Sequence, residues 1–115
     1  MSKDTIDSAT FGALQEAAGA DFVADLVQTF LDEAPAMLAD LTASLAVGDA
    51  ERFRRVAHSL KSNSNTFGAT ALGVLARELE LSAKDRVAAG DPAPLEALAQ
   101  EFARSAARLR EMARG

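Results

Sequence analysis

Apolar residues recur at intervals of three and four along almost the whole of this 115-residue chain. Such spacing places them on one face of an α-helix, whereas a half-buried strand alternates apolar and polar residues. No sustained alternation rich in β-branched and aromatic residues interrupts the pattern. The chain is therefore predicted to be all-α, with each helix burying one apolar face against its neighbours.

Turn and capping residues divide this pattern into one short helix and four longer ones. The short helix begins after Asp7 or Ser8 as N-cap and ends at Gly19. The longer helices are predicted at about 21–46, 49–67, 70–89 and from the loop at 91–94 onward. Four substantial helices with short connections favour an antiparallel up-down-up-down bundle, with the short helix as an extra N-terminal element.

Two stretches within these helices depart from good helix-forming sequence. Pro35 removes one backbone hydrogen bond, so a kink or break is expected there. The run 62–65 reads Ser-Asn-Ser-Asn and costs about 2 kcal/mol relative to alanine, so propensity alone ends that helix near Lys61. Small polar residues in such a place suit the close approach of a partner's backbone. The alternative is simple fraying before Gly68.

The composition is that of a folded globular protein, and it excludes several functions. With 49% apolar and 25% charged residues, the chain is predicted to form one domain over residues 1–115. It has no cysteine, which excludes disulfides and thiolate metal sites. Its net charge of −5 argues against nucleic acid and anionic membranes as partners. Without a signal peptide or spanning stretch, we expect a cytoplasmic protein that binds another protein.

His58 is the only histidine and the best chemical candidate in the chain. With about 100° per residue in an α-helix, Val56 and Leu60 point about 160° away from it, so His58 faces outward if those two mark the core. The residues within about 60° of it on the same helix are Arg54, Arg55, Lys61, Ser62 and Asn65.

This face suits a phosphoryl group. Positive neighbours disfavour a protonated imidazole and leave a nucleophilic nitrogen. The same cations, with donors from Ser62 and Asn65, could hold a phosphoryl group on the ring. Because phosphoryl transfer needs mainly positioning and charge stabilisation, so small a site suffices if a partner supplies a metal ion and acidic residues.

The segment from Ala57 to Ala69 resembles the signature of the histidine-containing phosphotransfer (HPt) family, His-x-Leu-Lys-Gly-Ser followed by Leu/Phe-Gly-Ala. Glu-Ala-Pro at 33–35 and the Leu-Glu pair at 79–80 extend the similarity over nearly the whole chain. The matching residues of the signature are His58, Leu60, Lys61, Ser64, Phe67, Gly68 and Ala69.

The resemblance implies a phosphocarrier of a phosphorelay, not an enzyme with turnover. His58 would accept a phosphoryl group from the phospho-aspartate of one receiver domain and pass it to another, with Lys61 steadying the phosphate. The partners would be response-regulator receiver domains and a hybrid histidine kinase; Mg²⁺ is expected on the receiver, and no metal or cofactor on this chain. The partner or phosphate face would comprise Arg54, Arg55, Ser62, Asn65 and Gly68.

Ser62 is the main departure from the family pattern, which usually has glycine there; Asn63 likewise replaces the usual serine. Glycine lets the receiver's loop approach the imidazole, and serine adds a Cβ and a hydroxyl at that contact. We therefore expect slower or more partner-selective transfer.

Other functions are left open or disfavoured. The same bundle could dock on a receiver or kinase as an adaptor that carries no phosphate. A di-iron or other metal enzyme lacks the several histidines and the Glu-x-x-His pairs it requires, and Glu78 and Glu80 are interpreted as surface charge. A Ser or Asp nucleophile paired with His58 has no support in sequence, although pairing in space stays open. We expect a free-standing monomer, since Met1 begins the chain and a receiver must reach an exposed helix face.

Overall fold

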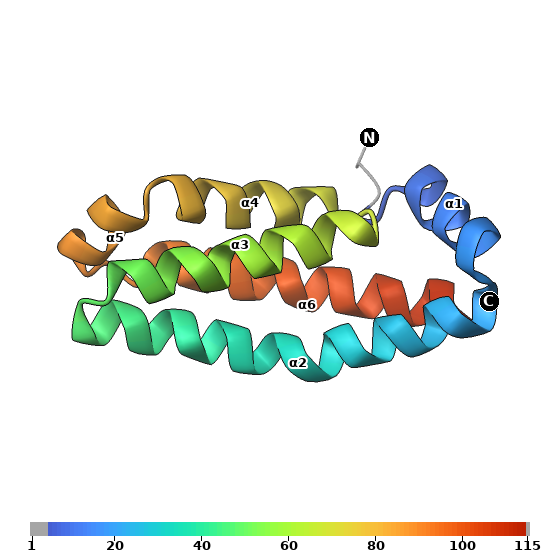
Figure 1. The fold of residues 1–115 in the computed structure, drawn as a ribbon, viewed down its shortest axis with the longest axis horizontal. Helices are drawn as coiled ribbons and strands as arrows, with labels where there is room; N and C mark the ends of the chain where they lie inside the picture. Colours follow the sequence, from blue (N-terminus) through green and yellow to red (C-terminus); the bar gives the residue numbers. More distant parts are fainter. Residues whose placement is uncertain (1–4, 115) are drawn as a thin grey trace.

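The computed structural model describes residues 5–114, which form six α-helices and no strand (Figure 1). The all-α prediction is confirmed for this part of the chain. Residues 1–4 and 115, which belong to the predicted domain, lie outside the described residues. The helices are α1 (Ser8–Ala18), α2 (Ala20–Val47), α3 (Ala50–Thr66), α4 (Thr70–Leu81), α5 (Ala83–Ala89) and α6 (Ala93–Arg114).

Helices α2, α3, α4 and α6 lie lengthwise beside one another, each running opposite to the long helix before it (Figure 1). This is the predicted antiparallel four-helix bundle, and α1 packs at one end of it as the extra N-terminal helix. Three phenylalanines pack together between the helices: Phe30 of α2 stacks on Phe67, at the end of α3, at a centroid distance of 5.4 Å and meets the edge of Phe102 of α6 at 6.0 Å. The large side chains that are almost fully buried include Phe11, Leu41, Phe53, Leu60, Leu72, Leu98 and Leu109.

The predicted helix at 70–89 is two helices, α4 and α5, so this prediction is wrong in its continuity. The junction is Ser82, whose backbone (φ −113°, ψ 20°) leaves the helical region. Its hydroxyl donates to the carbonyl oxygen of Glu78 at 2.6 Å, an interaction by which serine competes with the helical hydrogen-bond ladder. The apolar periodicity of the sequence continues across Ser82, because Leu79 and Ala83, on either side of it, are both buried in the core. The sequence pattern therefore did not indicate the break.

Helix α2 is unbroken from Ala20 to Val47, although Pro35 lies inside it. Figure 1 shows the helix changing direction near its middle, so of the expected kink or break it is the kink that occurs. Pro35 is exposed whereas Ala34 beside it is fully buried. The proline ring therefore faces solvent, and core packing on both sides of it keeps the helix in one piece.

Helix α3 continues past Lys61 to Thr66 through the four poor helix formers. Tertiary packing is the reason: Ser64 is fully buried, and its hydroxyl donates to the carbonyl oxygen of Leu60 at 2.7 Å. Phe67, just beyond the helix, is buried as well. Burial of this face outweighs a propensity cost of about 2 kcal/mol.

The turn after α3 is joined to the N-terminal segment. The Asp7 amide donates to the carbonyl oxygen of Gly68 at 2.8 Å. The Asp7 side chain accepts from the Thr10 amide, as predicted for the N-cap of α1. Among the helices of residues 5–114, none has the length and apolarity needed to cross a bilayer.

Candidate functional site

His58 lies on the side of α3 opposite to the core. Asp49 caps the helix by accepting from the Arg52 amide at 3.0 Å. Phe53, Ala57 and Leu60 are buried to within 1% of complete burial, and they fix the rotation of α3 about its axis. The His58 side chain keeps 54% of its surface exposed, so the predicted outward orientation is correct.

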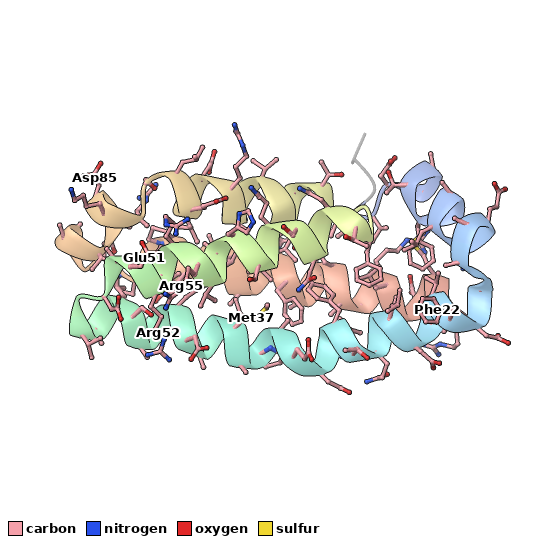
Figure 2. All side chains as sticks on the ribbon, in the orientation of Figure 1. Phe22, Met37, Glu51, Arg52, Arg55 and Asp85 are labelled. Atoms are coloured by element: carbon pink, nitrogen blue, oxygen red, sulfur yellow. The ribbon has the colours of Figure 1, made fainter. Side chains whose placement is uncertain are left out.

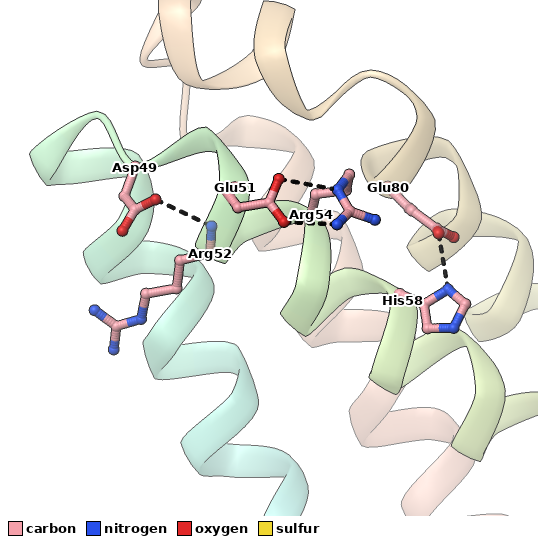
Figure 3. A network of polar contacts seen from close by, with 6 residues as sticks. All are labelled: Asp49, Glu51, Arg52, Arg54, His58 and Glu80. Atoms are coloured by element: carbon pink, nitrogen blue, oxygen red, sulfur yellow. Dashed lines mark hydrogen bonds and ion pairs between the residues drawn. The ribbon is translucent and has the colours of Figure 1, made fainter.

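A carboxylate from the neighbouring helix α4 contacts the imidazole directly (Figure 3). Nδ1 of His58 lies 2.8 Å from Oε2 of Glu80, and Nζ of Lys61 lies 2.9 Å from Oε1 of the same residue. Glu80 is largely buried, with 13% of its side chain exposed, against 24% for Lys61. One carboxylate therefore joins the histidine and the lysine of the motif.

Glu80 is held in its ionised form. The ammonium of Lys61, and next to it the imidazole of His58, lower the pKa of Glu80, although burial acts in the opposite direction. The sequence predicted cations around His58, but the group in direct contact with the ring is this anion. The reason is that α4 runs antiparallel beside α3, a relation that the helical wheel of α3 does not contain.

The two arginines predicted to lie near His58, Arg54 and Arg55, have different surroundings. Arg54 forms an ion pair with Glu51, with Nη2 at 2.6 Å from Oε2. This pairing lowers the pKa of Glu51 and raises that of Arg54. Arg55 is exposed and lies in the half of α3 nearer its start, as do Glu51 and Arg52 (Figure 2). The charge of Arg54 is thus partly neutralised, so it is less available to an anion than the sequence suggested.

The small polar residues after Lys61 lie at the surface. Ser62 is exposed, as predicted for a residue on the His58 side. Asn65 is exposed too, but its carboxamide lies against Gly73 of α4, where any side chain would collide with it. Asn65 therefore contacts α4 as well as facing solvent.

Gly68 does not lie on the His58 face, and its placement there was wrong. It is buried in the turn between α3 and α4 with φ +81°. A Cβ at this position would lie 2.9 Å from the backbone oxygen of Asp7. Glycine is required here because the backbone is left-handed and the N-terminal segment packs directly against it.

Glu80 is the site residue that sequence reasoning missed. Its interpretation as surface charge was wrong, whereas Glu78 is exposed as expected. The sequence feature that could have identified Glu80 is the Leu-Glu pair at 79–80. A helix that follows α3 and runs antiparallel to it passes beside His58 at about this position. Within residues 5–114, no group of three or more His, Asp or Glu side chains is arranged to hold a metal ion.

The site thus presents one half-exposed imidazole on an open helix surface. One ring nitrogen is engaged by Glu80, and the second lies on the far side of the ring from the carboxylate (Figure 3). A fixed cation, Lys61, lies one helical turn further along α3. This arrangement can present a nucleophilic nitrogen to a group that another macromolecule carries.

Comparisons with known proteins agree with this geometry. Residues 25–111 match the family model described as the Hpt domain. A solved structure, that of histidine-containing phosphotransfer protein B (HptB) from Pseudomonas aeruginosa PAO1, superimposes with a TM-score of 0.87 at 31% sequence identity. The match covers 98% of this chain and 97% of that one. The chain matches none of the curated proteins with which it was compared.

Proposed function

Since this chain belongs to the histidine-containing phosphotransfer family, phosphocarrier domains of phosphorelay signalling that are not enzymes, we propose that His58 is the residue that carries the phosphoryl group. It accepts the group from the phospho-aspartate of one receiver domain and passes it to another. The observation that carries this proposal is the half-exposed imidazole of the single histidine, anchored through one nitrogen by a largely buried carboxylate.

Lys61 is proposed to steady the phosphoryl group. Its ammonium is 2.9 Å from Glu80 and lies one turn from His58 on the same helix, which places a compact positive charge beside the ring. A phosphoryl group on the ring brings nearly two negative charges, and an ammonium can stabilise them without giving up its contact with Glu80. Arg55 and Ser62 are exposed on the same helix and contribute to the surface that a receiver contacts.

The partners in this proposal are receiver domains and a hybrid histidine kinase, which act on the chain in the cytoplasm. The receiver contributes the aspartate and its Mg²⁺, so this chain contributes only the nucleophile and its surroundings. The chain works as one domain and as a monomer, because a receiver needs free access to the outer surface of α3.

Phosphoryl transfer from a purified receiver tests the proposal. The full chain is mixed with receiver domains charged with labelled phosphate by a small phosphodonor, and the label on the chain is followed over time. We expect label in a linkage that alkali preserves and acid cleaves, as for a phosphoramidate on imidazole. Stable binding to a receiver without label would instead support the adaptor function.

Ser62→Gly tests whether the serine restricts the partner's approach. Ser62 is exposed on α3, so removing its Cβ and hydroxyl opens space beside His58 without disturbing the core. We expect faster transfer from a cognate receiver, measured as the initial rate of label appearance. The cost is about 0.5 kcal/mol of helix stability, visible in urea unfolding. An unchanged rate with every receiver would exclude the steric explanation.

A further inference from the structure

Glu51, Arg54 and His58 lie in one line along the outer surface of α3. With about 100° per residue, Glu51 and Arg54 lie within about 40° of His58 around the helix. Cβ atoms one turn apart are about 5–6 Å from each other, which is less than the length of an arginine side chain. Helical side chains also lean toward the N-terminus, so the imidazole leans over the turn that carries Arg54. The guanidinium is therefore within reach of a group on the ring.

In the unphosphorylated chain, Arg54 is paired with Glu51. Its Nη2 and Nε lie 2.6 Å and 3.3 Å from the two carboxylate oxygens. Figure 3 shows the guanidinium between the carboxylates of Glu51 and Glu80. The side chains of Arg54 and Glu51 are 47% and 61% exposed, and exposed ion pairs of this kind contribute little to stability. Glu51 thus neutralises Arg54 through a contact that is easily exchanged.

A phosphoryl group on the ring changes the competition for Arg54. It carries nearly two negative charges and three acceptor oxygens, whereas the Glu51 carboxylate has one charge and two oxygens. The planar guanidinium has five N–H donors and matches phosphate oxygens with two parallel hydrogen bonds. Because the side chain is exposed, it can turn from Glu51 to the ring without a change in the backbone.

We propose that Arg54 and Glu51 form an exchangeable ion pair that regulates His58: Arg54 leaves Glu51 to bind the phosphoryl group on the ring, and Glu51 opposes this step by competing for Arg54. The proposal rests on the proposed function, because it requires a phosphoryl group on His58. Lys61 remains in contact with Glu80 at 2.9 Å, so Arg54 is a second cation, and its availability depends on Glu51.

Chemical phosphorylation by phosphoramidate tests the pair without a receiver. A bond forms between a ring nitrogen of His58 and phosphorus, the P–N bond of phosphoramidate breaks, and its electron pair leaves with ammonia. The variants are Arg54→Gln, Glu51→Gln and the double variant. Arg52→Gln and Asp40→Asn are matched controls with the same changes of charge. Arg52 pairs with Asp40 at 2.6 Å, as Arg54 does with Glu51, but it lies about 120° from His58 around α3.

We expect the initial rate of phosphorylation to fall about three- to tenfold in Arg54→Gln and to rise about twofold in Glu51→Gln. The double variant is expected to match Arg54→Gln, because Glu51 acts through Arg54. The two controls are expected to keep the wild-type rate, and urea unfolding establishes that every variant is folded. A rise from Glu51→Gln that persists without Arg54 overturns the proposal, as does a rate in Arg54→Gln no lower than in Arg52→Gln.

NMR of the arginine side chains follows the exchange directly. The Nε–H signals of Arg54 and Arg52 are identified by their absence from the spectra of the corresponding variants. We expect the Arg54 signal to shift when the ring is phosphorylated and the Arg52 signal to stay in place. An unmoved Arg54 signal overturns the proposal.

The failure of this proposal and that of the proposed function are distinguishable. If the chain accepts phosphate from phosphoramidate but from no receiver, the proposed function fails, and the rates and the NMR signals still decide the role of Arg54. If receivers phosphorylate the chain but Arg54→Gln keeps the wild-type rate with phosphoramidate, only the role of Arg54 is excluded. A ring that phosphoramidate and receivers both leave unphosphorylated overturns both proposals.

Discussion

His58→Gln is expected to abolish acceptance of the phosphoryl group, with a rate at least about 10³-fold below that of the wild type. The glutamine nitrogen has its lone pair delocalised into the amide and is no nucleophile. The chain has no other histidine that could take over. Because the side chain is half-exposed, we expect the free energy of unfolding to change by no more than about 0.5 kcal/mol.

The measurement is the initial rate of label transfer from a charged receiver, with urea unfolding of the same sample to establish that it is folded. Ser59→Ala is the control, because Ser59 is the exposed neighbour of His58 in the chain and has no part in the proposed site. Label that persists in His58→Gln in an alkali-labile linkage would show a carboxylate acceptor and contradict the assignment of His58.

Gly68→Ala is expected to lower the free energy of unfolding by about 2 to 4 kcal/mol. Two costs add at this position. A left-handed backbone with φ +81° disfavours any Cβ, and the new Cβ would lie 2.9 Å from the backbone oxygen of Asp7 and 3.1 Å from Cβ of Thr10. The Asp7 amide also donates to the Gly68 carbonyl at 2.8 Å, so relief of the collision strains this hydrogen bond.

Two other glycines separate these costs, and urea unfolding measures all three variants. Gly48 has φ +79° but no neighbour within 4 Å of a Cβ, so Gly48→Ala is expected to cost about 1 kcal/mol from the backbone alone. Gly12 lies inside α1 with open space around it, so Gly12→Ala is expected to be neutral or to stabilise by up to about 1 kcal/mol. If Gly68→Ala and Gly48→Ala lower the free energy of unfolding equally, the contact between the new Cβ at position 68 and Asp7 costs nothing.

Much of the fold could be predicted because helical periodicity and capping are local. The wide apolar stripe of α2, the Asp7 cap and the glycines after α1 and α2 are patterns within a few residues of one another. They gave the number and order of the long helices, and short connections then favoured antiparallel packing. The error lay at Ser82, where the outcome depends on which side of the helix meets the core.

The features of the site can likewise be divided into those that follow from one helix and those that depend on other parts of the fold. The outward orientation of His58 was predictable, because it follows from the angles between residues on one helix. The poor helix formers after Lys61 gave the wrong local signal for the end of α3, since the burial of Ser64 and Phe67 depends on residues of other helices. Gly68 was placed on the wrong surface because its neighbour in space, Asp7, is distant in sequence.

The sequence by itself determined that the chain is helical, that its single histidine faces outward, and that Lys61 lies on the same side of α3. Only the tertiary structure decided that a carboxylate of α4 contacts Nδ1 and Lys61 together. The physical reason is that side-chain angles along one helix are fixed by its local geometry. The partner of an exposed side chain depends instead on the offset between two antiparallel helices, which the packing of their buried faces sets.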